Sequence, residues 1–258
     1  MRGIRRFAIR LLPALALFVA APAGAAGLRL VTGMDYPPFA GPDLPEGGMA
    51  TDLVLAAFEA AGRPVEPVEY LPWKRGYQAV LDGEFDATFP YVDAPDRRLA
   101  MTFSTSLYDA EIWPVFRSDR MRSYTGPDSL IGLTLCQPVG YAPPTVLLQM
   151  IESGMLRLVQ PATMPLCARQ LLAGRVDLLI NSVALFNTIV RPEWHGGPAP
   201  MMADHPVTQN PLFVLADRRN PKAPEIMAAF AKGLGLLRAD GRYQAIVDRH
   251  LGPVSTTQ

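Results

Sequence analysis

Aromatic side chains and one arginine gather at predicted strand ends, where open α/β sheets bind their ligands. Aromatic rings supply apolar contact area for a small solute, and a guanidinium binds a carboxylate through two parallel hydrogen bonds. Any one of these aromatic residues, taken alone, is also compatible with ordinary core packing. The residues are Tyr36, Phe39, Trp73, Tyr91, Arg97 and Tyr108. Together they indicate a site for a small anionic or zwitterionic solute.

Motifs of catalysis are absent from the sequence. It contains no G-x-S-x-G nucleophile elbow, no H-E-x-x-H motif and no G-x-x-x-x-G-K-[ST] phosphate loop. The histidines are scattered, and two cysteines without a histidine nearby cannot complete a zinc site. We therefore expect neither a metal nor a cofactor. An enzyme would need an acid/base carboxylate in its cleft, and the candidates are Asp35, Asp93 and Glu111.

Short apolar strands alternate with amphipathic helical stretches along the chain. This order predicts βαβ units and mainly parallel sheets. The first unit comprises strands at 28–32, 65–71, 85–89 and 112–116, helices at 49–61 and 72–82, and a polar loop leading to Arg98. After a charged break at 117–122, strands are predicted at 131–136, 156–159, 176–180 and 212–216, with helices at 145–150, 166–173, 224–237 and 243–250. The chain therefore consists of two α/β units with a helical C-terminal segment.

The N-terminus has the three regions of a secretory signal peptide. A segment with four arginines precedes a short apolar stretch and the small residues Ala23-Gly24-Ala25. The apolar stretch is shorter than the ~20 residues that cross a bilayer, which argues against a membrane anchor. We expect residues 1–25 to be removed and the protein to be periplasmic. Without these four of its 24 basic residues, the chain carries about −4 charges, which together with the lack of basic runs argues against nucleic-acid binding.

Cys136 and Cys167 are the only cysteines. In an oxidising compartment such a pair predicts a disulfide. Two buried free thiols are the alternative interpretation.

Six sequence motifs, in order behind the signal peptide, resemble those of the periplasmic solute-binding proteins of family 3, the polar amino-acid transport type. Each motif alone is weak, and their order over nearly the whole mature chain makes the resemblance specific. The motifs are Met34-Asp35-Tyr36-Pro37-Pro38-Phe39, Gly48-Met49-Ala50-Thr51-Asp52-Leu53, Leu81-Asp82-Gly83-Glu84-Phe85-Asp86-Ala87, Ala94-Pro95-Asp96-Arg97 with Phe103-Ser104, Gly174-Arg175-Val176-Asp177, and Asp240-Gly241-Arg242-Tyr243 with Ile246.

The resemblance implies a type II periplasmic-binding-protein fold. In it, two α/β lobes with mixed sheets and helices on both faces are joined by two hinge crossovers. One lobe would comprise residues 26–115 and 208–258, and the other residues 116–207. Solute would be held in the cleft between them.

The resemblance also assigns ligand-binding positions residue by residue. Arg97 matches the arginine that binds the ligand carboxylate, and backbone N–H groups near Tyr141 can hold a carboxylate as well. Further residues expected at the ligand are Asp35, Tyr36, Phe39, Trp73, Tyr91 and Asn181. The sequence departs from the family pattern in two respects. Ala94 replaces a threonine, and the neutral Asn181 and Ser182 stand where the family has an aspartate for the α-ammonium. We therefore expect an amino acid, a plain carboxylate or another small polar solute.

The resemblance implies a monomer that captures a small-molecule solute and delivers it to the membrane permease of an ABC transporter. An orphan sensor or accessory binding protein would have the same features. An enzyme on the same fold, such as a dehydratase of cyclic carboxylates, is the alternative from a different class.

Overall fold

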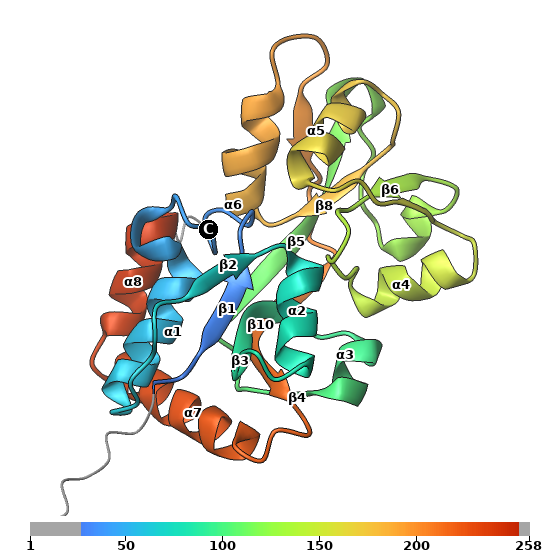
Figure 1. Ribbon diagram of the computed structural model, residues 1–258. Helices are drawn as coiled ribbons and strands as arrows, with labels where there is room; N and C mark the ends of the chain where they lie inside the picture. Colours follow the sequence, from blue (N-terminus) through green and yellow to red (C-terminus); the bar gives the residue numbers. More distant parts are fainter. Residues whose placement is uncertain (1–26, 253–258) are drawn as a thin grey trace, which may run out of the picture.

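The computed structural model describes residues 27–252, and the predicted signal peptide lies outside them. Two bodies of helices and strands lie beside each other, with two long strands running between them (Figure 1). We call these bodies lobe 1 and lobe 2. No helix within residues 27–252 is both long and apolar enough to span a membrane.

Lobe 1 is formed from the two ends of the described chain. Its elements are β1 (Leu30–Gly33), α1 (Met49–Ala60), β2 (Glu69–Leu71), α2 (Trp73–Leu81), β3 (Ala87–Val92), α3 (Pro95–Ala100), β4 (Met101–Phe103), α7 (Ala223–Ala239) and α8 (Arg242–Leu251). Successive residues of β1 enter different cores: Leu30 joins the cluster that includes α1, α7 and α8, whereas Val31 joins the one beneath α2. The alternation of side chains along a strand thus explains why both faces of the sheet carry helices.

Lobe 2 is formed from the middle of the chain. Its elements are β6 (Thr134–Cys136), α4 (Thr145–Glu152), β7 (Arg157–Val159), α5 (Met164–Leu172), β8 (Leu179–Asn181), α6 (Val183–Leu185), which continues as a π-helix over Phe186–Val190, and β9 (Pro200–Met202). A second core, with Leu130, Leu135 and Leu178, fills the part of this lobe next to α4, whereas the buried residues of α5 belong to the first cluster, which extends into lobe 2.

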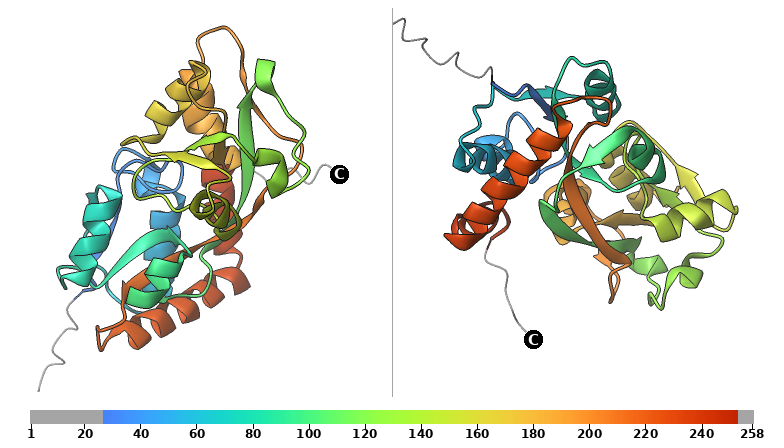
Figure 2. Two further views of the ribbon diagram at one scale, coloured as in Figure 1. Left: turned by 90° about the vertical axis from the view of Figure 1, so that its right-hand side faces the viewer. Right: turned by 90° about the horizontal axis from the view of Figure 1, so that it is seen from below.

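The two lobes are connected by β5 (Tyr108–Arg117) and β10 (Thr208–Asp217), which pair antiparallel and lie side by side (Figure 2). Residues 108–112 of β5 pair with β10, and residues from Trp113 onward pair with β8 and β9. Conversely, β10 pairs with β3 and β4 from Leu212 onward. Each strand therefore begins at the junction and ends inside one lobe.

The prediction of mainly parallel sheets is wrong. Strands β1, β2 and β3 pair in parallel, as do β6 and β7. All pairings of β5 and β10 with their neighbours are antiparallel. Strands β5 and β10 run in opposite directions. In lobe 1, β10 is antiparallel to β3 and β4, and in lobe 2, β5 is antiparallel to β8 and β9. The segment predicted as a polar loop before Arg98 also differs, since it forms the start of α3.

The same helix–turn–strand unit occurs in both lobes. Gly83 and Gly174 follow α2 and α5 with φ of 78° and 69°, the left-handed conformation that ends a helix most easily with glycine. Three residues later, Asp86 accepts a hydrogen bond from the backbone N–H that precedes β1, and Asp177 from the N–H that begins β6, both at 2.8 Å. These motif residues connect neighbouring strands and are structural.

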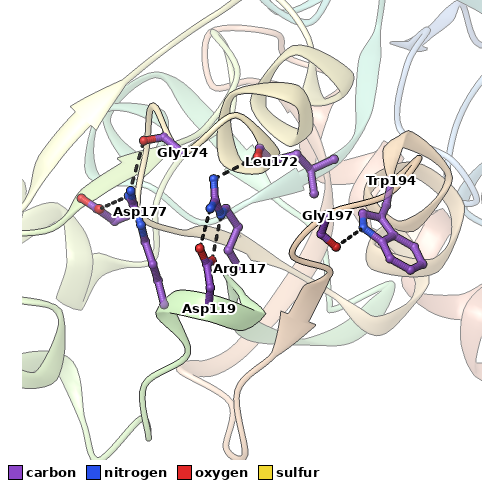
Figure 3. A network of polar contacts seen from close by, with 8 residues as sticks. Arg117, Asp119, Leu172, Gly174, Asp177, Trp194 and Gly197 are labelled. Atoms are coloured by element: carbon purple, nitrogen blue, oxygen red, sulfur yellow. Dashed lines mark hydrogen bonds and ion pairs between the residues drawn. The ribbon is translucent and has the colours of Figure 1, made fainter.

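Arg117 links the end of β5 to α5 in lobe 2 through a hydrogen bond. Its Nε and Nη2 donate to the Asp119 carboxylate at 2.9 and 2.5 Å, and its Nη1 donates to the Leu172 carbonyl at 3.1 Å (Figure 3). Leu172 ends α5, where carbonyl groups lack partners within the helix and a cation is favourable. Arg117 thereby links a crossover strand to the lobe that this strand enters.

The predicted disulfide is confirmed. Cys136 at the end of β6 is bonded to Cys167 in α5, with 5.5 Å between their Cα atoms, and both residues are fully buried. The bond joins strand β6 of lobe 2 to helix α5. Gln137 is the next residue in the chain after the bonded Cys136.

Breaking this disulfide should lower the free energy of unfolding by about 3–4 kcal/mol, because a loop of 31 residues is then no longer closed in the unfolded chain. Urea denaturation with and without reductant measures the loss. The double variant Cys136→Ala/Cys167→Ala is the control and should not respond to reductant. Equal unfolding midpoints for oxidised and reduced wild type would contradict this prediction.

Candidate functional site

A cavity lies where lobe 1, lobe 2 and the crossovers meet. It encloses about 560 Å³ of space outside protein atoms, open solvent at its mouth included. Its wall is formed by Tyr36, Trp73, Pro90, Tyr91, Val92, Arg97, Ile112, Gln137, Gly140, Tyr141, Ala142, Pro144, Ile180, Asn181, Ser182, Leu185, Asn210 and Leu212. Both lobes and both crossovers therefore contribute to one site.

Trp73 is positioned by its contact with the end of β1. A Cβ atom on Gly33 would lie only 2.1 Å from the Trp73 ring, so the indole occupies the space that a side chain would need. The indole Nε1 donates to Asp35 Oδ1 at 2.8 Å, and the Tyr91 hydroxyl donates to the Trp73 carbonyl at 2.8 Å. Trp73 is only 8% exposed, and these contacts fix its ring at the wall of the cavity.

Four aromatic rings form a continuous cluster around the cavity. Tyr36 meets Trp73 and Tyr141 edge to face, with centroids 5.7 and 5.5 Å apart, and Trp73 meets Tyr91 at 5.4 Å. Such edge-to-face pairs contribute beyond their buried area. Burial raises the pKa of Tyr91 to about 12 and raises the pKa of Tyr36 and Tyr141 as well, so these hydroxyls are neutral at physiological pH.

Arg97 contacts both lobes. Its Nη1 donates to the Val92 carbonyl at 2.9 Å and its Nη2 to the Gly140 carbonyl at 3.0 Å, while its guanidinium carbon lies 4.8 Å from the Tyr91 ring centroid. It is the only arginine or lysine within residues 27–252 that is buried, at 8% exposure, and it forms no ion pair with any residue there. Burial lowers its pKa. A guanidinium has five N–H donors, so donors remain for a ligand.

Lobe 2 approaches this site through a tight loop after β6. Gly140 has a φ of 90°, and a Cβ atom there would lie 3.0 Å from the Trp73 Cβ. Next to it, the Tyr141 hydroxyl reaches the Asp35 carbonyl at 3.5 Å. The glycine thus allows the lobe 2 backbone to approach both Arg97 and Trp73.

Most of the predicted ligand-binding residues come together at the cavity. Those in its wall are Tyr36, Trp73, Tyr91, Arg97, Tyr141 and Asn181. Asp35 and Phe39 are placed outside the wall. Asp35 supports Trp73, and burial raises the pKa of its carboxyl. Phe39 is fully buried behind Tyr36, with the two rings stacked 4.9 Å apart.

The remaining acid/base candidates also lie outside the cavity wall. Asp93 is paired with the exposed Arg98, and Glu111 belongs to β5 at an exposed position. Tyr108 packs against Phe39, with centroids 5.9 Å apart. Sequence reasoning did not identify Gln137 and Asn210, which line the cavity. Gln137 directly follows β6, so the rule that ligands bind at strand ends would have selected it, whereas Asn210 within β10 carries no such signal.

Two lobes, two crossover strands and a cavity at their junction define an α/β protein of the periplasmic-binding-protein type. The chain belongs to the bacterial extracellular solute-binding proteins, family 3, whose model matches residues 28–253. The predicted family and fold class are therefore confirmed. Comparison with curated proteins finds no match.

Solved structures share this fold at low sequence identity. A histidine kinase sensor domain with similarity to periplasmic binding proteins matches with a TM-score of 0.74 and 21% identity, covering 88% of this chain and 96% of its own. An ancestral arginine-binding protein bound to arginine matches at 0.71 and 20%, covering 88% and 98%. An ancestral amino-acid-binding protein described as a precursor of cyclohexadienyl dehydratase matches at 0.67 and 19%, covering 87% and 94%.

Substituting Gly33→Ala should displace the Trp73 indole from the cavity wall, because the added methyl group would overlap the ring. We expect a loss of about 1–3 kcal/mol in the free energy of unfolding and a change in tryptophan fluorescence. Gly235→Ala is the matched control, since a Cβ atom there meets nothing within 4 Å and the helix α7 favours alanine. If both variants were as stable as the wild type, the close contact between Gly33 and Trp73 would be refuted.

Proposed function

We propose that the protein captures a small carboxylate-bearing solute in the cavity between its lobes, and that Arg97 binds the carboxylate. The observation that carries this proposal is the burial of the Arg97 guanidinium at the cavity without a carboxylate partner among residues 27–252. A buried charge without a counter-ion is costly, and two carbonyl groups compensate it only in part. An anionic solute supplies the missing charge.

Arg97 also couples solute binding to the closure of the lobes. Its bond to Val92 stays within lobe 1, and its bond to Gly140 reaches lobe 2. We propose that residues 26–115 with 208–258 move against residues 116–207, with β5 and β10 as the hinges. A carboxylate held by Arg97 and covered by the loop at Gly140 and Tyr141 favours the closed arrangement, since it binds that arrangement more tightly.

Delivery to the permease of an ABC transporter after export to the periplasm is the role we propose, with the protein acting as a monomer. Family 3 membership and the fold shared with an ancestral arginine-binding protein support solute capture. The fold shared with a histidine kinase sensor domain supports the alternative role of an orphan sensor. Both roles require the same binding step.

Catalysis is a second candidate, supported by the fold shared with a dehydratase precursor. It requires an acid/base group at the substrate. Asp35 is hydrogen-bonded to the Trp73 indole and Asp93 is paired with Arg98, and neither belongs to the cavity wall. We therefore favour binding without turnover.

Replacing Arg97 should weaken solute binding severely while the fold persists. Thermal unfolding of residues 26–258 against a panel of amino acids, hydroxy acids and dicarboxylates would first identify a stabilising solute. For that solute, Arg97→Ala should raise the dissociation constant about 30-fold or more, since a lost buried charge pair costs at least ~2 kcal/mol.

Arg98→Ala is the matched control, because Arg98 is the exposed neighbour of Arg97 and is paired with Asp93. It should leave the affinity unchanged. Unchanged affinity of Arg97→Ala for the stabilising solute would contradict the proposed function.

A further inference from the structure

Two buried amide side chains in the cavity wall have an unpartnered oxygen. Gln137 is 5% exposed and Asn181 is 2% exposed, and neither Gln137 Oε1 nor Asn181 Oδ1 has a hydrogen-bond partner among residues 27–252. Their nitrogen ends are occupied: Gln137 Nε2 donates to the Ala142 carbonyl at 3.5 Å, and Asn181 Nδ2 lies 3.9 Å from Met164 Sδ. The free ends are therefore acceptors, and a buried acceptor without a donor is unfavourable.

Both acceptors come from strand ends of lobe 2. Gln137 follows β6, which is tied to α5 by the adjacent disulfide, and Asn181 is the last residue of β8. Rigid elements thus position them. Arg97 lies in the lobe 1 part of the same wall. A solute held by Arg97 at its carboxylate would present its other groups to these two oxygens when the lobes are closed.

The charge of the wall limits which donors fit. Arg97 is its only Asp, Glu, Lys or Arg residue. A monoanionic solute neutralises this charge. A neutral α-amino acid would neutralise Arg97 with its carboxylate and add a buried ammonium, for which the wall offers only neutral acceptors. A hydroxyl group can donate to Gln137 or to Asn181, and a primary amide has two N–H donors, in both cases without adding charge.

We propose, building on the proposed function, that the cavity selects small monoanionic carboxylates whose other polar groups are neutral donors, above all 2-hydroxy acids, over the corresponding α-amino acids. Gln137 and Asn181 are the specificity-determining residues. A hydroxyl has a single proton to donate, so one of these two oxygens accepts its hydrogen bond while Arg97 binds the carboxylate.

Matched pairs of ligands test this selection in the wild type. The pairs are L-lactate and L-alanine, 2-hydroxy-4-methylpentanoate and L-leucine, and 3-phenyllactate and L-phenylalanine, which differ only in a hydroxyl against an ammonium group. Calorimetric titration should show the hydroxy acid binding at least about 10-fold more tightly in every pair that binds. The preference should not depend on the side chain.

A single added carboxylate should reverse the preference. Asn181→Asp supplies the missing partner for an ammonium, so this variant should gain affinity for the amino acid of each pair and lose affinity for the hydroxy acid. Gln137→Glu provides the same test from the neighbouring strand. Asn187→Asp adds the same charge at an exposed position of lobe 2 and should leave the preference as in the wild type.

The outcomes separate this inference from the proposed function. Tighter binding of the amino acids by the wild type, with binding still lost in Arg97→Ala, would overturn the selection and leave solute capture intact. Binding of neither member of any pair would overturn the selection. A carboxylate that binds equally well to wild type and Arg97→Ala would overturn both.

Discussion

A buried guanidinium between two lobes is the constraint on which the arrangement of the site depends. Arg97 is held by one carbonyl from each lobe and stacks on Tyr91. It lines a cavity whose wall contains no Asp or Glu residue. Because desolvation of a charge is expensive, this geometry is most favourable when an anion occupies the cavity. In the proposed function, binding of the anion and contact between the lobes are parts of one equilibrium.

The surrounding elements maintain this geometry. Gly33 makes room for the Trp73 indole, Asp35 fixes the orientation of that indole, and Phe39 supports Tyr36 from behind. On the other side, the disulfide at Cys136 holds the strand that leads into the loop of lobe 2. The paired crossovers β5 and β10 join the two sides. Both strands change partners at the junction, which is where the proposed hinge lies.

The sequence predicted the parts of the fold that depend on local patterns. The helices at α1 and α2 follow from apolar spacing and a glycine stop, and the disulfide follows from a cysteine pair in an exported chain. The crossovers were predicted too short, because Asp109 and Glu111 at the start of β5, and Pro211 with the polar residues before it in β10, interrupt the apolar pattern.

The aromatic residues and the arginine of the candidate site could be predicted from the sequence. Which of their sequence neighbours line the cavity could not. Asp35 and Phe39 belong to the same motif as Tyr36, and adjacency in sequence does not reveal which side chain faces the cavity. The most direct test of the account compares a solute that the protein binds with the primary amide of the same solute by calorimetric titration. We predict that the amide binds about 30-fold or more weakly, since it cannot neutralise Arg97. Equal affinity of acid and amide would contradict the central role of the buried guanidinium.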